Sequence, residues 1–77
     1  MNNAEKHRDN EGIKAVGMLI RAARLKKSVS QQELANECDV DLSTINRFEL
    51  GKMSPSLSML FLIAAKLEVS PKDLMPD

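Results

Sequence analysis

Few side chains of this sequence could take part in covalent chemistry. Among the 77 residues there is one cysteine, Cys38, and one histidine, His7. Catalysis needs a nucleophile, a base and a group that orients the base, and two isolated residues do not supply that set. A single cysteine cannot form an internal disulfide, and no cysteines and histidines have metal-ligand spacing. The sequence therefore predicts a protein that is not an enzyme, has no metal site or cofactor, and uses Cys38 as a small core residue.

Charged side chains are balanced in number but unevenly placed. Eleven basic and eleven acidic residues give a formal net charge of +0. The segment 12–32 contains basic residues and no acid: Lys14, Arg21, Arg24, Lys26 and Lys27. Four acids follow it: Glu33, Glu37, Asp39 and Asp41. The balance excludes a general basic coat for nucleic acid, and each charge taken alone is interpreted as part of a solvated helix face.

The composition favours one small all-helical domain. Apolar residues make up 43% of the chain, which is enough for a core. Phe48 and Phe61 are the only aromatic residues, and β-branched runs are few, so helices are favoured over a sheet. A chain this short buries a modest share of its surface and often gains stability by pairing with a second copy.

The two ends of the chain differ in character. Residues 1–11 are polar and predicted to be an N-terminal tail, and residues 12–77 are predicted to form the domain. The start of the sequence lacks the apolar stretch of a signal peptide. The longest apolar run, 59–65, is too short to cross a bilayer. These features predict a cytoplasmic protein without a membrane partner.

Apolar spacing predicts a first helix from Gly12, with one buried face at intervals of three and four: Ile13, Val16, Ile20 and Ala23. The sequence Ser30–Glu33 has the pattern of a capping box, which predicts the start of a second helix. That helix ends near Cys38, where Asp39 can adopt the left-handed conformation.

Three further helices are predicted in the rest of the chain. Asp41 can cap the third helix, and Gly51 can end it. The fourth, 56–68, has this apolar stripe: Leu57, Leu60, Ile63, Ala64 and Leu67. The dipeptide Ser70-Pro71 predicts a short fifth helix that Leu74 anchors to the core. The expected fold is an all-α, compact five-helix bundle.

The second and third predicted helices form a compact helix-turn-helix unit. They are separated by only a few residues, 38–41, and the second of them ends at Gly51. In such a unit the first helix crosses the phosphate backbone of DNA, while the second lies in the major groove.

The spacing across this unit resembles that of the Xre/Cro family of bacterial and phage repressors. The resemblance is carried by Ser30-Gln31-x-x-Leu34-Ala35 and by Val40-x-x-x-x-Ile45-x-x-x-Glu49-x-Gly51-Lys52-x-x-Pro55, with Ile20-Arg21-x-x-Arg24 upstream and Leu60-x-x-Ile63-Ala64-x-x-Leu67-x-Val69 downstream. It covers residues 16–74 and implies a lambda-repressor-like fold that binds double-stranded DNA. The chain departs from the pattern at Ser28 and Asp39, where the family commonly has glycine.

The resemblance also implies which side chains contact DNA. The implied base-reading residues are Leu42, Ser43, Thr44, Asn46 and Arg47. Serine can donate or accept a hydrogen bond, asparagine can pair with adenine, and arginine can bind guanine through two hydrogen bonds. The implied phosphate contacts are Gln31, Lys52, Met53 and Arg21. The alternative is a solvated face without a ligand, which suits Leu42 least; Thr44 can instead serve mainly the first helical turn.

Arg24 and Glu49 have a structural role by the same resemblance. Residues at these positions pair between the first and third helices in the family. We therefore expect an ion pair that fixes the recognition helix and reads no base.

Surplus apolar residues near the C-terminus suggest a dimer. Met59 and Leu62 occupy positions that are usually polar in the family, and with Phe61 and Met75 they could form a symmetric dimer interface. The alternative is a wide core in which methionine fills gaps. Met18, Leu19 and Leu25 are also surplus, and the sequence assigns them no role.

The combined prediction is a dimeric transcriptional regulator that binds a roughly palindromic operator. Its two recognition helices would lie about 34 Å apart, one turn of DNA. Among small members of the family, the layout is most similar to a controller protein of a restriction–modification system. The rival class is an antitoxin or adaptor whose main ligand is another protein, which the neutral net charge and the apolar Leu42 fit better.

Overall fold

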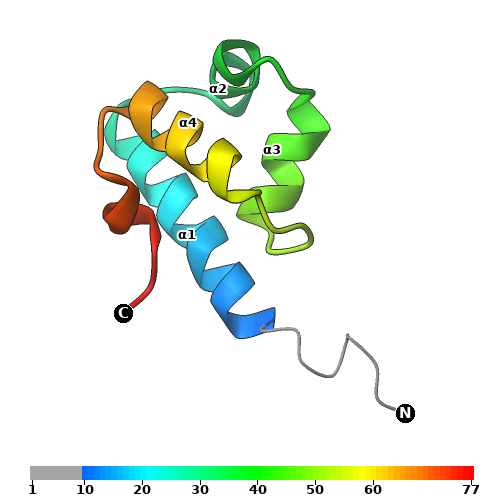
Figure 1. Ribbon diagram of the computed structural model, residues 1–77. Coiled ribbons are helices and arrows are strands. Elements are labelled where there is room, and N and C mark those ends of the chain that lie inside the picture. Colours follow the sequence, from blue (N-terminus) through cyan, green and yellow to red (C-terminus); the bar gives the residue numbers. More distant parts are fainter. Residues whose placement is uncertain (1–9) are drawn as a thin grey trace.

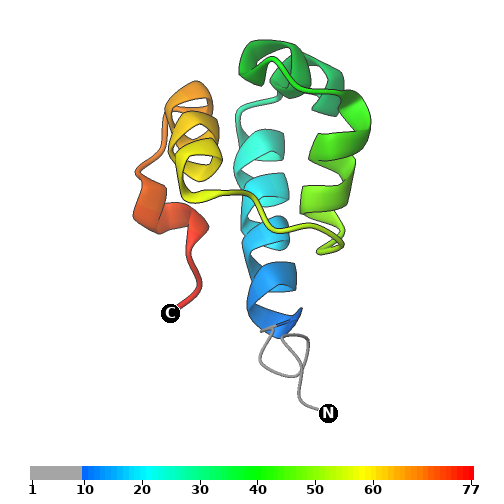
Figure 2. The ribbon, with the colours of Figure 1, turned by 45° about the vertical axis from the view of Figure 1, so that its right-hand side comes forward.

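The computed structural model describes residues 10–77, which fold into helices and connecting turns without a β-strand. The elements are α1 (Asn10–Lys26), α2 (Gln31–Cys38), α3 (Leu42–Glu49), α4 (Leu57–Leu67) and the short 3₁₀ helix η2 (Pro71–Leu74). Figure 1 shows α4 in front, with η2 beside α1. In the turned view of Figure 2, α1 runs between α3 on one side and α4 with η2 on the other. The prediction of an all-α fold is confirmed. His7 and most of the expected tail lie outside the described residues.

Every element contributes one fully buried large side chain to the core. These side chains are Ile20 in α1, Leu34 in α2, Ile45 in α3, Ile63 in α4 and Leu74 in η2. Smaller or flatter side chains fill the space between them: Ala35, Cys38, Phe48 and Ala64. Because the core draws on all five segments, each of them is held by burial of apolar surface.

Two sequence expectations were wrong at helix starts. Leu57 was expected in the buried stripe, but 64% of it is exposed. It begins α4 between two exposed serines, where no other element packs over it. Asp41 is the N-cap residue of α3, but its side chain makes no capping hydrogen bond. Ser56, by contrast, accepts a hydrogen bond from the Met59 amide at 3.1 Å.

The expected fifth helix is a single 3₁₀ turn, so the described chain has four α-helices. Pro71 starts the turn, and the Asp73 carboxylate accepts a hydrogen bond from the Ser70 amide at 3.0 Å. The turn ends because Met75 is extended, with φ −109° and ψ 133°. Met75 precedes Pro76, and a residue before proline is displaced from the α-region by the proline ring. Leu74 is nevertheless fully buried, as predicted.

The backbones of α1 and α3 touch at Gly17. A Cβ atom at this position would collide with the carbonyl oxygen of Phe48 and would lie 2.9 Å from that of Glu49. The absence of a side chain therefore permits the close approach of the two helices. The sequence did not predict this contact, because helix periodicity shows which residues share a face but not how closely two helices approach.

Gly17→Ala is expected to destabilise the fold by about 1–3 kcal/mol, because the added methyl group forces two backbones apart. Alanine normally stabilises a helix over glycine, so the sign is opposite to that of intrinsic propensity. The control is Ala22→Gly at an exposed site of α1, which should cost about 0.5–1 kcal/mol. Urea unfolding measures both; a Gly17→Ala variant as stable as the wild type would contradict the close approach.

Candidate nucleic-acid interface

The turn between α2 and α3 is short and well defined. A capping box starts α2: the Glu33 amide donates to Ser30 Oγ at 3.0 Å, and the Ser30 amide donates to Glu33 Oε1 at 2.8 Å. The hydrogen bonds from Ser30 lower the pKa of the Glu33 carboxyl below its ordinary value. Asp39 ends α2 in the left-handed region, with φ 58° and ψ 45°. The predicted cap and the predicted turn conformation are both confirmed.

One face of α3 is buried and the opposite face is polar and exposed. Ile45, Phe48 and Glu49 point inward, whereas Ser43, Asn46 and Arg47 are exposed at helical spacing. Leu42 is 43% exposed at the start of the helix, and Thr44 is half-buried. The exposed residues present hydroxyl, amide and guanidinium groups on one surface, which are groups that can pair with base edges.

Leu50 shares this exposed face, and sequence reasoning did not identify it. It is the C-cap residue of α3 and is 52% exposed. Its position seven residues after Ser43 is the signal that could have revealed it, because residues seven apart lie on the same side of a helix.

The phosphate candidates come from three segments: α1, the start of α2 and the loop after α3. Gln31 is the first residue of α2, and its Nε2 donates to Glu49 Oε1 at 2.9 Å. One amide hydrogen of that side chain is left to donate elsewhere. Arg21 is exposed on α1.

Two candidate phosphate contacts, Lys52 and Met53, follow the end of α3, and they differ in whether the side chain or the main-chain amide is available. Lys52 is exposed, but its amide donates to the Arg47 carbonyl at 2.9 Å, so only its ammonium group is available. Met53 packs against the core, and its amide donates to no group within residues 10–77. A main-chain contact is therefore possible at Met53 and not at Lys52.

A buried ion pair connects α1 to α3. Arg24 Nε lies 2.6 Å from Glu49 Oε2, and Arg24 Nη2 lies 3.0 Å from Glu49 Oε1. Both residues are only 7% exposed. Arg24 Nη1 also donates to the Val29 carbonyl at 2.9 Å. Together with the hydrogen bond from Gln31, these contacts join the end of α1, the start of α2 and the end of α3.

The chemical state of the buried groups fits a structural role. The hydrogen bond to Glu49 raises the pKa of the Arg24 guanidinium above its ordinary value, although burial acts in the opposite direction. Burial raises the pKa of the Cys38 thiol, which keeps it protonated and unreactive. No group of three potential metal ligands occurs within residues 10–77. None of the helices in that range is long and apolar enough to cross a membrane.

The four residues expected at a dimer interface fall into two sets. Phe61 and Met75 are 51% and 48% exposed, whereas Met59 and Leu62 are half-buried and pack against the core. Successive residues of an α-helix are about 100° apart, so Met59 and Phe61 lie on opposite flanks of α4. Leu57, four residues before Phe61, shares its flank.

Comparison with known proteins agrees with this geometry. The sequence profile of the helix-turn-helix family HTH_3 matches residues 20–74. The chain is 42% identical over 60 residues to Control protein C.BamHI of Bacillus amyloliquefaciens, covering 77% of this chain and 74% of that protein. The crystal structure of the restriction-modification controller protein C.AhdI from Aeromonas hydrophila has a TM-score of 0.78 and 28% identity, covering 82% of this chain and 96% of that one. The crystal structure of the hypothetical transcription factor NHTF from Neisseria has a TM-score of 0.78 and 30% identity, covering 90% of this chain and 80% of that one.

The chain belongs to the Xre-like helix-turn-helix family, a family of DNA-binding transcriptional regulators and not of enzymes. The family profile spans the ion pair, the helix-turn-helix unit and the core residues of α4 and η2. The resemblance inferred from the sequence is therefore confirmed.

Glu49→Gln is expected to cost roughly 3 kcal/mol of unfolding free energy, because it leaves the buried Arg24 charge without an opposite charge. The matched control is Glu68→Gln, which removes the exposed partner of Lys27 and should cost no more than about 1 kcal/mol. Urea unfolding at neutral pH measures both. Equal losses for the two variants would show that burial does not strengthen the Arg24–Glu49 pair.

Proposed function

We propose that the protein is a sequence-specific transcriptional regulator that binds a roughly palindromic DNA operator as a dimer. The observation that carries the proposal is the exposed face of α3, which presents Ser43, Asn46 and Arg47 together with Leu42. The buried ion pair to α1 holds this face in place from behind. A rigid helix with donors and acceptors on one exposed side suits direct reading of the major groove.

The roles within the α3 face follow from side-chain chemistry. Arg47 would bind guanine through two hydrogen bonds, Asn46 would pair with adenine, and Ser43 would donate or accept at either base. Leu42 would contact a thymine methyl group. Thr44 is half-buried, so we assign it the smallest share in base reading.

Phosphate contacts would position this face on the duplex. The amide of Gln31 lies in the first turn of α2, where amides lack partners within the helix. The remaining amide hydrogen of its side chain, the Lys52 ammonium group and the Met53 amide would add further contacts. Arg21 would contribute longer-range attraction. Local contacts of this kind, and not the net charge of the chain, determine phosphate affinity.

The biological context that we propose is control of a restriction–modification system. It is supported by the similarity to Control protein C.BamHI, which extends over 60 residues at 42% identity. The structural similarity to C.AhdI covers 96% of that controller protein. A transcriptional reporter placed under the promoter region next to the gene of this protein would test whether the protein changes its own expression.

For the dimer we favour the flank of α4 that carries Phe61, extended by Met75. Both are large apolar side chains about half exposed to solvent, and a contiguous exposed apolar patch is typical of an interaction site. Leu62, the next residue after Phe61, would support this surface from the core side, since it is already packed, whereas Met59 packs on the other flank.

Arg47→Ala is expected to weaken binding to a duplex selected from a random library by about 1–3 kcal/mol and to relax base preference at one position of each half-site. Lys52→Ala should weaken selected and random duplexes alike and reduce the salt dependence by about one counterion. Anisotropy titrations over a range of salt concentrations measure both effects. Lys72→Ala is the control, because η2 packs on α1 and α4. Absence of binding to any duplex at low salt would exclude the proposal.

Phe61→Glu is expected to convert the dimer to a monomer, because two carboxylates would be buried against each other at the interface. Sedimentation equilibrium measures the mass. Met18→Glu is the control, since Met18 is 69% exposed on α1 and should leave the dimer intact. Met59→Glu tests the other flank of α4 in the same way. A wild-type protein that stays monomeric, or a Phe61→Glu variant that stays dimeric, would contradict the proposed interface.

A further inference from the structure

The outer face of α1 carries an apolar stripe that neither the core nor the DNA-reading face uses. Met18 is 69% exposed and Leu25 is 50% exposed. Ala22 between them is also exposed, and Ala15 is half-buried. These four residues, called the α1 stripe below, recur at intervals of three, four and three. That spacing places them in one line along the helix, as in the seam of a coiled coil.

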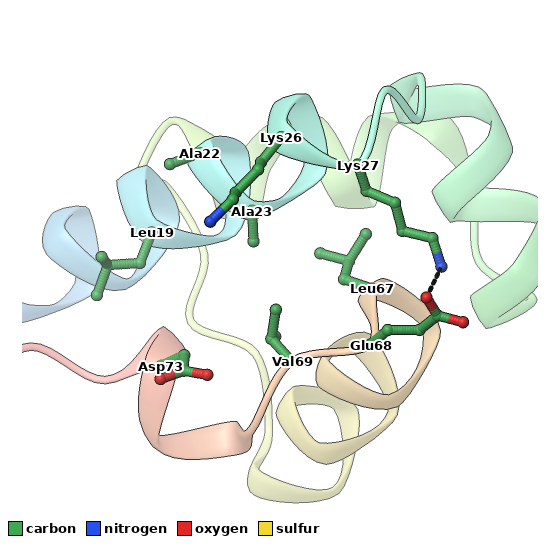
Figure 3. A pocket seen from close by; sticks show the side chains of 9 residues that line it. All are labelled: Leu19, Ala22, Ala23, Lys26, Lys27, Leu67, Glu68, Val69 and Asp73. Carbon is green, nitrogen blue, oxygen red and sulfur yellow. Dashed lines mark ion pairs between the residues drawn. The ribbon is translucent and has the colours of Figure 1, made fainter.

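A groove continues the α1 stripe toward α4. The groove has a volume of about 570 Å³ and lies between α1 and the segment that joins α4 to η2. In Figure 3, Leu19 and Ala23 of α1 face Leu67 and Val69 across it. Ala22 belongs to both the stripe and the groove lining. The groove lining also includes two acids: Glu68 is paired with Lys27, and the Asp73 carboxylate accepts a hydrogen bond from the Ser70 amide. The apolar surface of α1 therefore continues into a concavity whose acidic groups have partners within the chain.

Basic side chains border this surface on both sides. Lys14 and Arg21 lie along one edge of the α1 stripe and Lys26 along the other, and all three are exposed. Within residues 10–77 the ion pairs are Arg24 with Glu49 and Lys27 with Glu68. The three bordering cations therefore have no acidic partner in the part of the chain that the structure describes.

We propose that the α1 stripe and its groove dock an amphipathic α-helix of another protein, one whose apolar seam is bordered by acidic residues. The seam spacing fits a helix, because large and small side chains alternate and leave holes at the alanines for side chains of a facing helix. The unpaired cations fit acidic flanks by charge complementarity.

A second copy of this chain is a poorer occupant of the stripe. If two α1 helices packed antiparallel, the edge with Lys14 and Arg21 would face the same edge of its partner. If they packed parallel, Arg21 would face Lys26 of the partner. Either arrangement opposes like charges along the seam, which is destabilising.

An anionic membrane is also a poorer fit. Interfacial helices insert a broad apolar face of bulky residues, whereas half of the α1 stripe is alanine and the adjoining surface is concave. The docking site also differs from the α3 face, because α3 packs on α1 at Gly17 and Met18 lies about 100° further round the helix. Arg21 borders both surfaces. A docked helix would therefore leave the α3 face open.

The test uses the full chain and two labelled synthetic helical peptides of about three heptads. Both carry leucine at the seam positions; one has glutamate at the flanking positions, and the other has lysine there. Fluorescence anisotropy should show that the glutamate peptide binds about tenfold more tightly than the lysine peptide. Met18→Ser should weaken binding of the glutamate peptide about tenfold, because it removes apolar area that the docked peptide would bury.

Leu57→Ser is the matched control, because Leu57 is 64% exposed on α4 and Met18 is 69% exposed on α1. It should bind the glutamate peptide like the wild type. Both substitutions are at exposed sites, and thermal unfolding verifies the fold of both variants. DNA binding is checked for Met18→Ser alone, because Leu57 lies on the α4 flank proposed for the dimer. Three outcomes would overturn the proposal. The first is equal affinity for the two peptides. The second is no binding of the glutamate peptide at about 1 mM. The third is a Met18→Ser effect seen only in self-association or on phosphatidylserine vesicles.

Discussion

The contact between Arg24 and Glu49 determines where α3 can lie. Two opposite charges are removed from water at the junction of α1 and α3, with Arg24 Nε and Glu49 Oε2 2.6 Å apart. Such burial is favourable only when the remaining donors and acceptors are also satisfied. The Val29 carbonyl and the Gln31 side chain fulfil that condition, so the pair fixes the loop after α1 and the start of α2 as well as α3.

The rest of the helix-turn-helix unit follows from this constraint. Gly17 allows α1 and α3 to approach until their backbones touch, and the pair then fixes their alignment. The inner face of α3 is thereby buried against the rest of the domain. Its outer face needs no internal partners, so Ser43, Asn46 and Arg47 stay available to a ligand. Glu49 also accepts a hydrogen bond from the Gln31 side chain, which connects the α1–α3 contact directly to a candidate phosphate contact.

Local signals made most of the fold predictable from the sequence. The capping box at Ser30, the left-handed Asp39 and the stop at Gly51 act within a few residues, and each is present in the structure. Contacts between distant segments were less predictable: no sequence pattern marked Gly17 or the Gln31–Glu49 hydrogen bond. The exposure of Leu57 depends on which elements pack over the start of α4. At the candidate site, the resemblance indicated residue types and positions, whereas the occupied Lys52 amide and the exposed Leu50 required the structure.

We infer that α3, held by the ion pair to α1, is the surface that meets DNA. Chemical-shift mapping of the labelled protein with a selected duplex tests this most directly. We expect the largest changes at the side chains of Ser43, Asn46 and Arg47 and at the amides of Gln31 and Met53, with little change on the outer face of α1. Changes concentrated on α1 or α4, with α3 unaffected by saturating duplex, would contradict it.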